Sequence, residues 1–178
     1  RLGVSPDAVA GHSFGEVTAL HAAGVLSEAD MLLVARRRGE LMSAAGTIPG
    51  AMTAVSAPLD VVEAALATLG RTDVVMANHN APSQVVISGA VEGIEAAERA
   101  LSEGGVRFTR LDVATAFHSP VVAASEGPFA EFLAGVGFAD QTLPVWSGEA
   151  AAPYASGVEA KRQRLAQQIA NPVRFVSL

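Results

Sequence analysis

A serine near the start of the chain lies in a setting that suits nucleophilic chemistry. Ser13 is the centre of the segment Gly11–Gly15, which has the pattern Gly-x-Ser-x-Gly. On a sharp strand-to-helix turn such a serine projects its hydroxyl clear of the backbone, and we expect both glycines to relieve crowding there. The amide of Phe14 at the start of the following helix is then placed to stabilise an oxyanion. The alternative is an ordinary turn in which Ser13 caps the helix.

A serine hydroxyl needs a base, and the chain has four histidines. They are His12, His21, His79 and His118. His12 is adjacent to the serine, but its side chain is expected to point to the other side of the turn. His21 lies two turns along the helix and His79 lies beside a hairpin turn, so both are expected to serve in packing or at the surface. His118 lies in the segment ATAFHSP, where the chain returns from one predicted subdomain to another. It is therefore the candidate base, although a structural role remains the alternative.

An arginine occupies an unusual place on the helix predicted over Ser27–Gly46. Arg38 falls in the middle of the apolar face of this helix, whereas Arg36 and Arg37 point elsewhere. A charge on an apolar face is costly unless it is paired, so a structural salt bridge or a side chain that extends to the surface is one interpretation. The other is that the guanidinium holds a substrate carboxylate in a bidentate fork. This second interpretation predicts an acyl group that carries a free carboxylate.

The elements that must position these residues indicate an α/β fold. Residues 8–13 are predicted to be a strand and Gly15–Ala23 a helix that ends at Gly24. The next segment has the order β-α-β-β-α-β, which is typical of a ferredoxin-like arrangement. Its predicted elements are Ala51–Ser56, Leu59–Leu69, Val74–Asn78, Gln84–Ser88, Val91–Ser102 and Val106–Val113.

After this segment the chain is predicted to rejoin the first part. The predicted elements are a helix over Ser125–Gly135, a strand over Leu143–Trp146 and a helix over Val158–Ala170 that Asn171-Pro172 ends. We therefore predict a large subdomain formed by residues 1–48 and 114–178, with a small subdomain of residues 49–113 inserted into it.

Composition and charge exclude several classes of protein. The 178 residues include no cysteine, so disulfides, thiolate metal sites and a cysteine nucleophile are excluded. A net charge of −6 disfavours nucleic acid or an anionic membrane as the main partner. The histidines are too scattered to predict a metal site, and no apolar run reaches the roughly 18 residues that span a bilayer. We expect a cytoplasmic globular protein.

Four stretches of the chain resemble blocks of a known family. They are GHSFGEVTALHAAGVLSEADMLLVARRRGELM, NHNAPSQVVISG, AFHSP and QQIANPVRF. Together they resemble the malonyl-CoA:acyl carrier protein transacylases and the acyltransferase domains of polyketide synthases. The short sequences FGE and RRRGELM are similar to those of iterative synthases of the enediyne or polyunsaturated fatty acid types. The resemblance implies an α/β-hydrolase-like large subdomain with an inserted ferredoxin-like small subdomain. It also implies N- and C-terminal parts beyond these residues, including a glutamine-containing loop with a second oxyanion donor.

The resemblance also implies roles for individual residues. Ser13 matches the nucleophile, His118 the base and Arg38 the residue that holds the extender carboxylate. Gln168 matches the glutamine whose amide helps to orient the catalytic histidine. In this family the serine and histidine work without a carboxylate, and Asp112 is a weak candidate for one here.

The residue before the histidine bears on the choice of extender unit. Phe117 resembles the malonyl type, since a phenylalanine would crowd the α-methyl of methylmalonyl. The oxyanion donor of the family matches the amide of Phe14.

The implied activity is a ping-pong transfer of malonyl from malonyl-CoA to the phosphopantetheine thiol of an acyl carrier protein, in polyketide or fatty acid synthesis. The domain is expected to bind no cofactor of its own, to bind no nucleic acid or membrane, and to be linked to other synthase domains. The basic cluster Lys161, Arg162 and Arg164 is our candidate docking site for the acidic carrier, although such clusters are usually solvated helix faces. The alternatives are a serine hydrolase or editing thioesterase, which would not need Arg38, and a non-catalytic docking domain.

Overall fold

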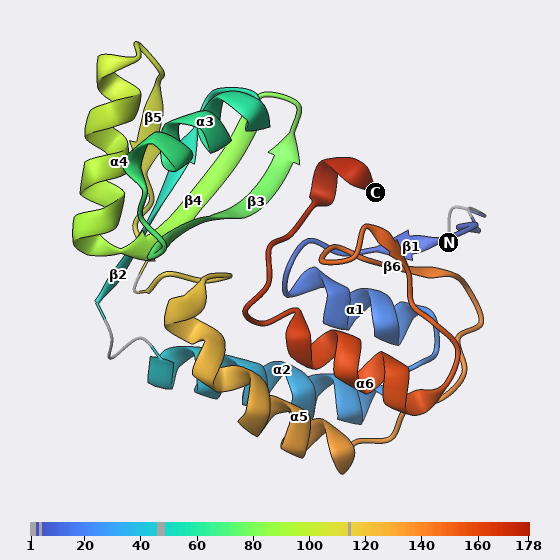
Figure 1. The fold of residues 1–178 in the computed structure, drawn as a ribbon. Coiled ribbons are helices and arrows are strands. Elements are labelled where there is room, and N and C mark those ends of the chain that lie inside the picture. The colour runs from blue at the N-terminus through green and yellow to red at the C-terminus, as the bar shows by residue number, and fades with distance from the viewer. Residues whose placement is uncertain (1–2, 4, 46–48, 114) are drawn as a thin grey trace.

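The computed structural model describes residues 3, 5–45, 49–113 and 115–178 (Figure 1). Its α/β architecture contains two sheets, a three-stranded sheet of order β1-β6-β7 and a four-stranded sheet of order β3-β4-β2-β5. We call residues 50–110 the four-stranded region, and residues 5–45 and 115–178 together the helical region. The blue and the orange-to-red parts of the ribbon in Figure 1 lie side by side, so the two ends of the chain build the helical region together.

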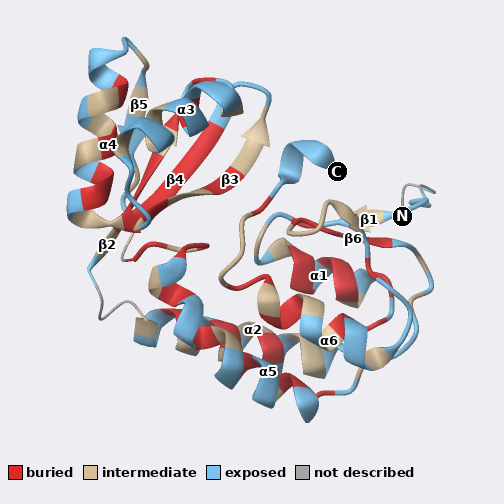
Figure 2. Ribbon diagram, in the orientation of Figure 1, coloured by how far each residue is buried: buried red, intermediate tan, exposed pale blue. Residues whose placement is uncertain are grey.

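The helical region encloses one core between its helices and its small sheet. Its elements are β1 (Val9–Ala10), α1 (Gly15–Ala22), α2 (Glu28–Ala45), η1 (Pro120–Ser125), α5 (Glu126–Ala134), β6 (Val145–Ser147), β7 (Ala152–Pro153), α6 (Val158–Gln167) and η2 (Phe175–Ser177). β1 runs parallel to β6, and β7 is antiparallel to β6. Fully buried side chains such as Leu20, Phe129 and Leu165 bring α1, α5 and α6 into this core (Figure 2).

The four-stranded region has the predicted β-α-β-β-α-β order. Its elements are β2 (Gly50–Val55), α3 (Leu59–Leu69), β3 (Val74–Ala81), β4 (Gln84–Ala90), α4 (Val91–Glu103) and β5 (Phe108–Arg110). All neighbouring strands are antiparallel. Because side chains alternate along a strand, β2 sends Val55 to the core under α3 and α4 and Met52 to the opposite face. On that opposite face Phe117 of the helical region packs against the sheet.

The segment after α6 joins the two regions. Val173 lies beside the edge strand β3, where its N–H donates to the Ala77 carbonyl at 2.8 Å and its carbonyl accepts from the His79 N–H at 2.8 Å. Edge strands present unpaired backbone groups, so this short pairing satisfies part of the free edge of β3. The residues on either side of Val173 are thereby held against both regions.

Several predicted boundaries are confirmed, and others differ. The Ser27 hydroxyl accepts a hydrogen bond from the Asp30 N–H at 3.0 Å, as expected of a helix cap, and Gly24 adopts a positive φ of 78°. The predicted end of α2 at Gly46 lies outside the described residues. The strand predicted over residues 8–13 is shorter, because the turn that carries Ser13 begins directly after Ala10. The short edge strand β7 was not predicted.

None of the described helices combines the length and the apolar character that crossing a membrane requires.

Candidate active site

Ser13 lies on a strained turn between β1 and α1. Its φ of 52° is in the left-handed region, which is uncommon for a residue other than glycine and occurs at functional turns. A Cβ on Gly11 would lie 2.0 Å from the carbonyl carbon and oxygen of Gly15, so only glycine fits there. A Cβ on Gly15 itself would meet nothing within 4 Å. The prediction that both glycines relieve crowding is therefore correct for Gly11 and wrong for Gly15.

The amide of Phe14 is free at the start of α1. The turn is closed by three other backbone bonds, from Gly15 to His12, from Glu16 to Ser13 and from Val17 to Phe14. No described residue accepts a hydrogen bond from the Phe14 N–H. This N–H is next to the serine and at the positive end of the helix dipole, so it can donate to an oxyanion that forms at Ser13.

His118 contacts the serine directly. Its Nε2 lies 2.7 Å from the Ser13 hydroxyl, although 105 residues separate the two in sequence. Its Nδ1 lies 2.9 Å from the backbone carbonyl of Asn171. Because a carbonyl oxygen only accepts, Nδ1 carries the proton and Nε2 is free to take the proton of Ser13. Asp112 is exposed, and both ring nitrogens of His118 have other partners.

The environment of His118 keeps its imidazole neutral. Only 2% of the residue is exposed, and burial lowers the pKa of His118 from 6.5 to about 4. The value of about 4 already includes a smaller lowering by the positive charge of Arg38 and an opposing contribution from the bond to the Asn171 carbonyl. A neutral imidazole at pH 7 is the form that a general base requires.

The other three histidines have structural partners or positions away from the serine hydroxyl. The His12 ring lies 2.7 Å from the Asn80 side-chain oxygen and packs edge-on against Phe175. His21 lies 2.9 Å from the Leu26 carbonyl. His79 lies within β3. Of the four histidines, all of which lie in the described ranges, His118 alone has a ring nitrogen within hydrogen-bond distance of the Ser13 hydroxyl.

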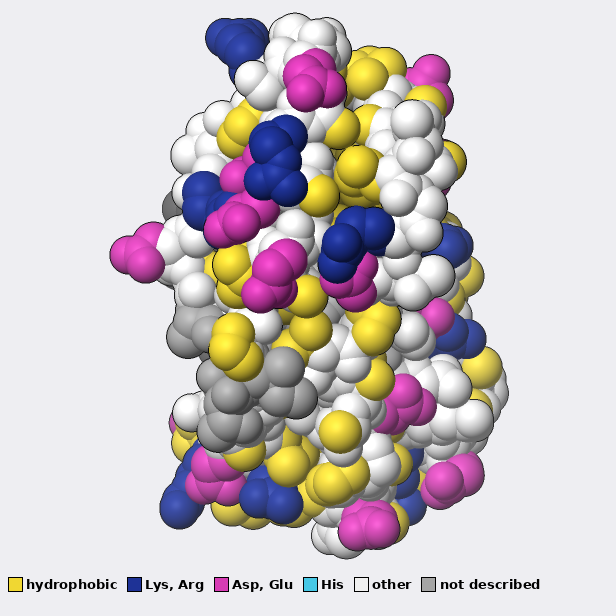
Figure 3. Space-filling view, turned by 60° about the vertical axis from the view of Figure 1, so that its left-hand side comes forward, with side chains coloured by type: hydrophobic (Ala, Val, Ile, Leu, Met, Phe, Trp, Pro, Cys, Tyr) yellow, Lys and Arg dark blue, Asp and Glu magenta, His cyan; other side chains and the backbone are white. Residues whose placement is uncertain are grey.

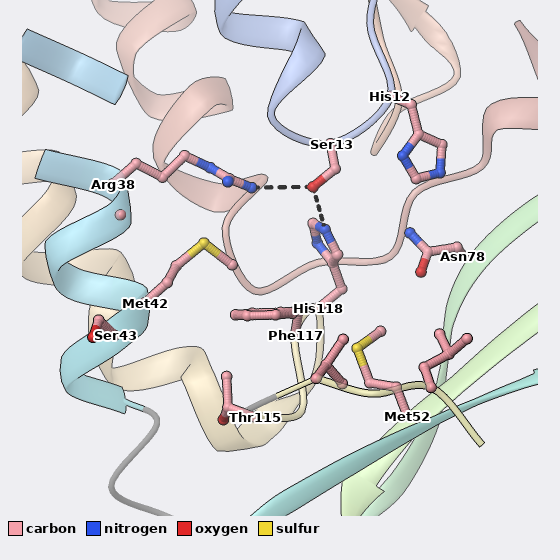
Figure 4. Close-up of a pocket in the computed structure, with 13 residues that line it drawn as sticks. His12, Ser13, Arg38, Met42, Ser43, Met52, Asn78, Thr115, Phe117 and His118 are labelled. Atoms are coloured by element: carbon pink, nitrogen blue, oxygen red, sulfur yellow. Dashed lines mark hydrogen bonds between the residues drawn. The ribbon is translucent and has the colours of Figure 1, made fainter. Parts of the chain in front are cut away.

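Arg38 extends from α2 to the other side of the same hydroxyl (Figure 4). It is 4% exposed, and its Nη2 donates to the Ser13 hydroxyl at 3.2 Å and to the Gln168 side-chain oxygen at 3.3 Å. Its Nε is buried without a hydrogen-bond partner, and no described carboxylate forms an ion pair with it. Burial lowers the pKa of Arg38 to about 10, which leaves the group charged at pH 7. This buried cation without an anion excludes the surface and salt-bridge interpretations and favours a ligand carboxylate.

Gln168 has different partners from those predicted. Its side-chain N–H donates to the Ser13 carbonyl at 3.0 Å and its oxygen accepts from Arg38. The side-chain amide thus fixes the turn and the arginine, while the ring of His118 is held by the Asn171 carbonyl. The prediction that the Gln168 amide orients the histidine is corrected accordingly.

A cavity of about 600 Å³ lies beside the side chains of Ser13, Arg38 and His118. Ser13, Arg38 and His118 line one part of it. The apolar side chains that line the rest are Met42 of α2, Met52 of β2, and Leu111, Val113 and Phe117 of the chain that follows β5. In Figure 4, Met42 and Phe117 lie together below the contact between Arg38 and Ser13. Phe117 therefore limits the space beside the serine. Within the described ranges, no three histidine or acidic side chains converge on a point where a metal ion could be held.

The exposed basic patch predicted on α6 is wrong for Lys161. Lys161 is only 1% exposed, and its ammonium donates to the Ala139 carbonyl at 3.1 Å. Arg162 donates to the Val136 carbonyl and Arg164 pairs with Glu149. Figure 3 shows a different face of the molecule, on which Lys and Arg side chains lie beside Asp and Glu side chains.

Sequence reasoning missed two parts of this site. The acceptor for His118 is a backbone carbonyl, which no side-chain pattern can indicate. Glu16 is fully buried directly behind the turn, where it accepts a hydrogen bond from Tyr154, 138 residues away. An acidic residue in the first turn of a helix is ordinarily explained by the helix dipole, so its sequence position carried no signal of burial.

Sequence comparisons with known proteins match this chain to one family. The family model described as an acyl transferase domain matches residues 1–178. A malonyl CoA-acyl carrier protein transacylase of Synechocystis sp. is 40% identical over 173 residues, which cover 97% of this chain and 57% of that protein. The chain thus spans just over half of this relative's length.

Solved structures agree with this result. The acyltransferase domain of an iterative polyketide synthase in enediyne biosynthesis has a TM-score of 0.89 and 33% identity, covering 99% of this chain and 46% of that chain. A malonyl-transacylase solved in complex with its type II polyketide synthase acyl-carrier protein has a TM-score of 0.90 and 31% identity. That match covers 98% of this chain and 57% of that chain.

Proposed function

Because this chain belongs to the acyl transferase domain family, we propose that it moves a malonyl group from malonyl-CoA to the phosphopantetheine thiol of an acyl carrier protein. The observation that carries this proposal is the joint contact of His118 and Arg38 with the hydroxyl of Ser13. The first contact supplies a base, and the second places a buried cation beside the acyl group. The named activities of the relatives support the same reaction.

In the first half-reaction the serine becomes acylated. His118 Nε2 takes the proton of Ser13 while Oγ attacks the thioester carbonyl, and the Phe14 N–H stabilises the resulting oxyanion. As the oxyanion collapses, the bond between carbon and sulfur breaks, and the Nε2 proton passes to the departing thiolate of coenzyme A. The product is malonyl-Ser13 with a neutral His118.

In the second half-reaction the carrier protein takes the acyl group. His118 Nε2 accepts the proton of the phosphopantetheine thiol, and the sulfur attacks the ester carbonyl of malonyl-Ser13. When the bond between carbon and Oγ breaks, the proton returns to Ser13. The phosphopantetheine arrives with the carrier, so the domain needs no bound cofactor for these steps.

Selectivity for malonyl follows from two side chains. Arg38 can offer its unpartnered Nε and the Nη2 on the same edge of the guanidinium to the free carboxylate of the acyl group, which then replaces the neutral acceptors that Nη2 contacts in this structure. Phe117 limits the space available to an α-methyl substituent. We therefore place malonyl above both acetyl and methylmalonyl as the preferred group.

We further propose the subdomain division for this chain. Residues 1–48 and 114–178 form the α/β-hydrolase-like large subdomain, and residues 49–113 form the ferredoxin-like insertion. The strand order β3-β4-β2-β5 and the shared core of the two chain ends support this division. The whole protein is then a cytoplasmic component of a polyketide or fatty acid synthase, with linked synthase domains.

The test is to follow the fate of the malonyl group. Malonyl-CoA is incubated with the full-length protein and a phosphopantetheinylated carrier protein, and malonyl-carrier and free malonate are quantified. Malonyl-carrier as the main product supports transfer. Free malonate in the presence of carrier would indicate a hydrolase, and consumption of no malonyl-CoA would indicate a docking domain.

A further inference from the structure

A buried carboxylate lies behind the nucleophile turn. Glu16 is 0% exposed and lies in the first turn of α1, three residues after Ser13. One of its oxygens accepts from the Tyr154 hydroxyl, and the other accepts from the Gly148 N–H at 3.1 Å. Burial raises the pKa of Glu16, and these two hydrogen bonds oppose that shift. Neither half-reaction proposed above uses this carboxylate, although burying it is costly.

The contacts of Gly148 continue toward the catalytic histidine. Its carbonyl accepts from the Arg174 N–H at 2.7 Å. Arg174 ends the short segment that begins at Asn171, whose carbonyl accepts from His118 Nδ1 at 2.9 Å. Hydrogen bonds thus join Glu16 to Gly148 and Gly148 to Arg174, and the chain from Arg174 back to Asn171 leads to the bond with the His118 ring.

The packing along this row is tight. A Cβ on Gly148 would lie 3.1 Å from a Val173 methyl and 3.5 Å from the Glu16 carboxylate. Val173 is itself fixed on its other side by the edge of β3. The segment therefore has little room to shift unless Gly148 shifts as well.

We propose that Glu16 is a positioning residue that, through Gly148 and the segment 171–174, holds the Asn171 carbonyl in place for His118. The role rests on the proposed transfer, in which the geometry of the base limits both half-reactions. The carboxylate does not touch the reacting atoms. It fixes the position of the loop on which the acceptor for Nδ1 depends, and small displacements of such a group reduce rates strongly.

The test replaces Glu16 with glutamine. Gln has nearly the same shape but no charge. Its oxygen can still accept from the Gly148 N–H, while its NH₂ can only donate to the Tyr154 oxygen, so the charge-assisted bond from the Tyr154 hydroxyl is replaced by a weaker neutral one. We expect Glu16→Gln to lower the acylation rate roughly 10- to 100-fold with an unchanged KM for malonyl-CoA. Malonyl and acetyl donors should lose the same factor, because both need His118. The matched control is Glu28→Gln, an exposed residue on α2 that should leave the rates unchanged.

Two results would overturn the proposal. One is a wild-type rate in folded Glu16→Gln. The other is a loss confined to malonyl, which would mean that Glu16 acts through the charge of Arg38, whose pKa it raises. If Glu16→Gln does not fold, Tyr154→Phe replaces it, since it frees one carboxylate oxygen and keeps the ring. A fall of several-fold shared by both donors supports the proposal, and unchanged rates contradict it.

A spectroscopic measurement separates this proposal from the transfer activity. The proton NMR signal of His118 Nδ1–H reports its hydrogen bond to Asn171 and needs no substrate. We expect this signal to shift between the wild type and Glu16→Gln, and an unchanged signal would contradict the positioning role. If the wild type transfers no acyl group while the signal shifts, the proposed function fails and the structural coupling stands.

Discussion

Replacing Arg38 with alanine tests how the proposed acyltransferase recognises its acyl group. The guanidinium is buried beside Ser13, and its Nε has no partner. We expect the substitution to reduce malonyl transfer far more than acetyl transfer, since only malonyl carries a carboxylate that can bind Nε and Nη2 together. Malonyl transfer and acetyl transfer both lose the 3.2 Å contact between Nη2 and the Ser13 hydroxyl.

The size of each loss follows from the bonds involved. The shared contact with Ser13 is worth about 1.5 to 3 kcal/mol at most, because it joins a charged donor to a neutral hydroxyl. The malonyl carboxylate adds two charge-assisted bonds of about 1.5 to 3 kcal/mol each, or about 3 to 6 kcal/mol together. At about 1.4 kcal/mol for each factor of ten, the preference for malonyl over acetyl should fall by roughly 10²- to 10⁴-fold.

The assay is a comparison of kcat/KM for malonyl-CoA and acetyl-CoA with the same carrier protein. Arg36→Ala is the matched control, because Arg36 lies on the same helix, is exposed and pairs with Glu40 at 2.8 Å. Exposed pairs of this kind contribute little, so both rates should stay near those of the wild type. Equal losses for the two donors in Arg38→Ala would refute the role of Arg38 as the carboxylate receptor.

Three further predictions concern neighbouring parts of the site. Phe117→Ser should raise the use of methylmalonyl relative to malonyl by roughly 10- to 200-fold, which is what one methyl group contributes in a pocket. Competition between the two CoA esters measures this ratio, and an unchanged ratio would show that Phe117 does not determine the choice of extender unit. The acid limb of kcat/KM for malonyl-CoA should have an apparent pKa near 4, because activity is lost only as pH falls through the lowered pKa of His118; a limb near 6.5 would contradict the buried neutral base. Gly11→Ala should destabilise the protein by at least about 1 to 3 kcal/mol, because its Cβ would overlap the Gly15 backbone, whereas Gly15→Ala should stay within about 1 kcal/mol of the wild type in thermal unfolding.

The parts of the site that depend on side-chain identity were accessible from sequence. Ser13 was indicated by the glycines around it, and Arg38 by a charge in the middle of an apolar helix face. Both features are local, since a turn and a helix fix which residues share a face within about 20 residues. The order of elements in the four-stranded region was predicted for the same reason, because each strand and helix has its own periodicity.

The parts that depend on long-range contacts were not accessible. The acceptor for His118 is the backbone of Asn171, 53 residues away, and backbone carbonyls are the same in every sequence. Lys161 looks like part of a basic cluster, yet its ammonium is buried against the Ala139 carbonyl of another segment. Glu16 resembles an ordinary helix-start acid until Tyr154 and Gly148 are placed around it. Only the folded arrangement reveals these partners.

The proposed acyl-enzyme can be observed directly. The protein is mixed with malonyl-CoA, its intact mass is measured, and carrier protein is then added, with Ser13→Ala treated in parallel. We predict that the wild type gains the mass of one malonyl group on Ser13 and loses it to the carrier, while Ser13→Ala gains none. A wild type that gains no mass, or an adduct of equal size in Ser13→Ala, would contradict the assignment of Ser13 as the nucleophile.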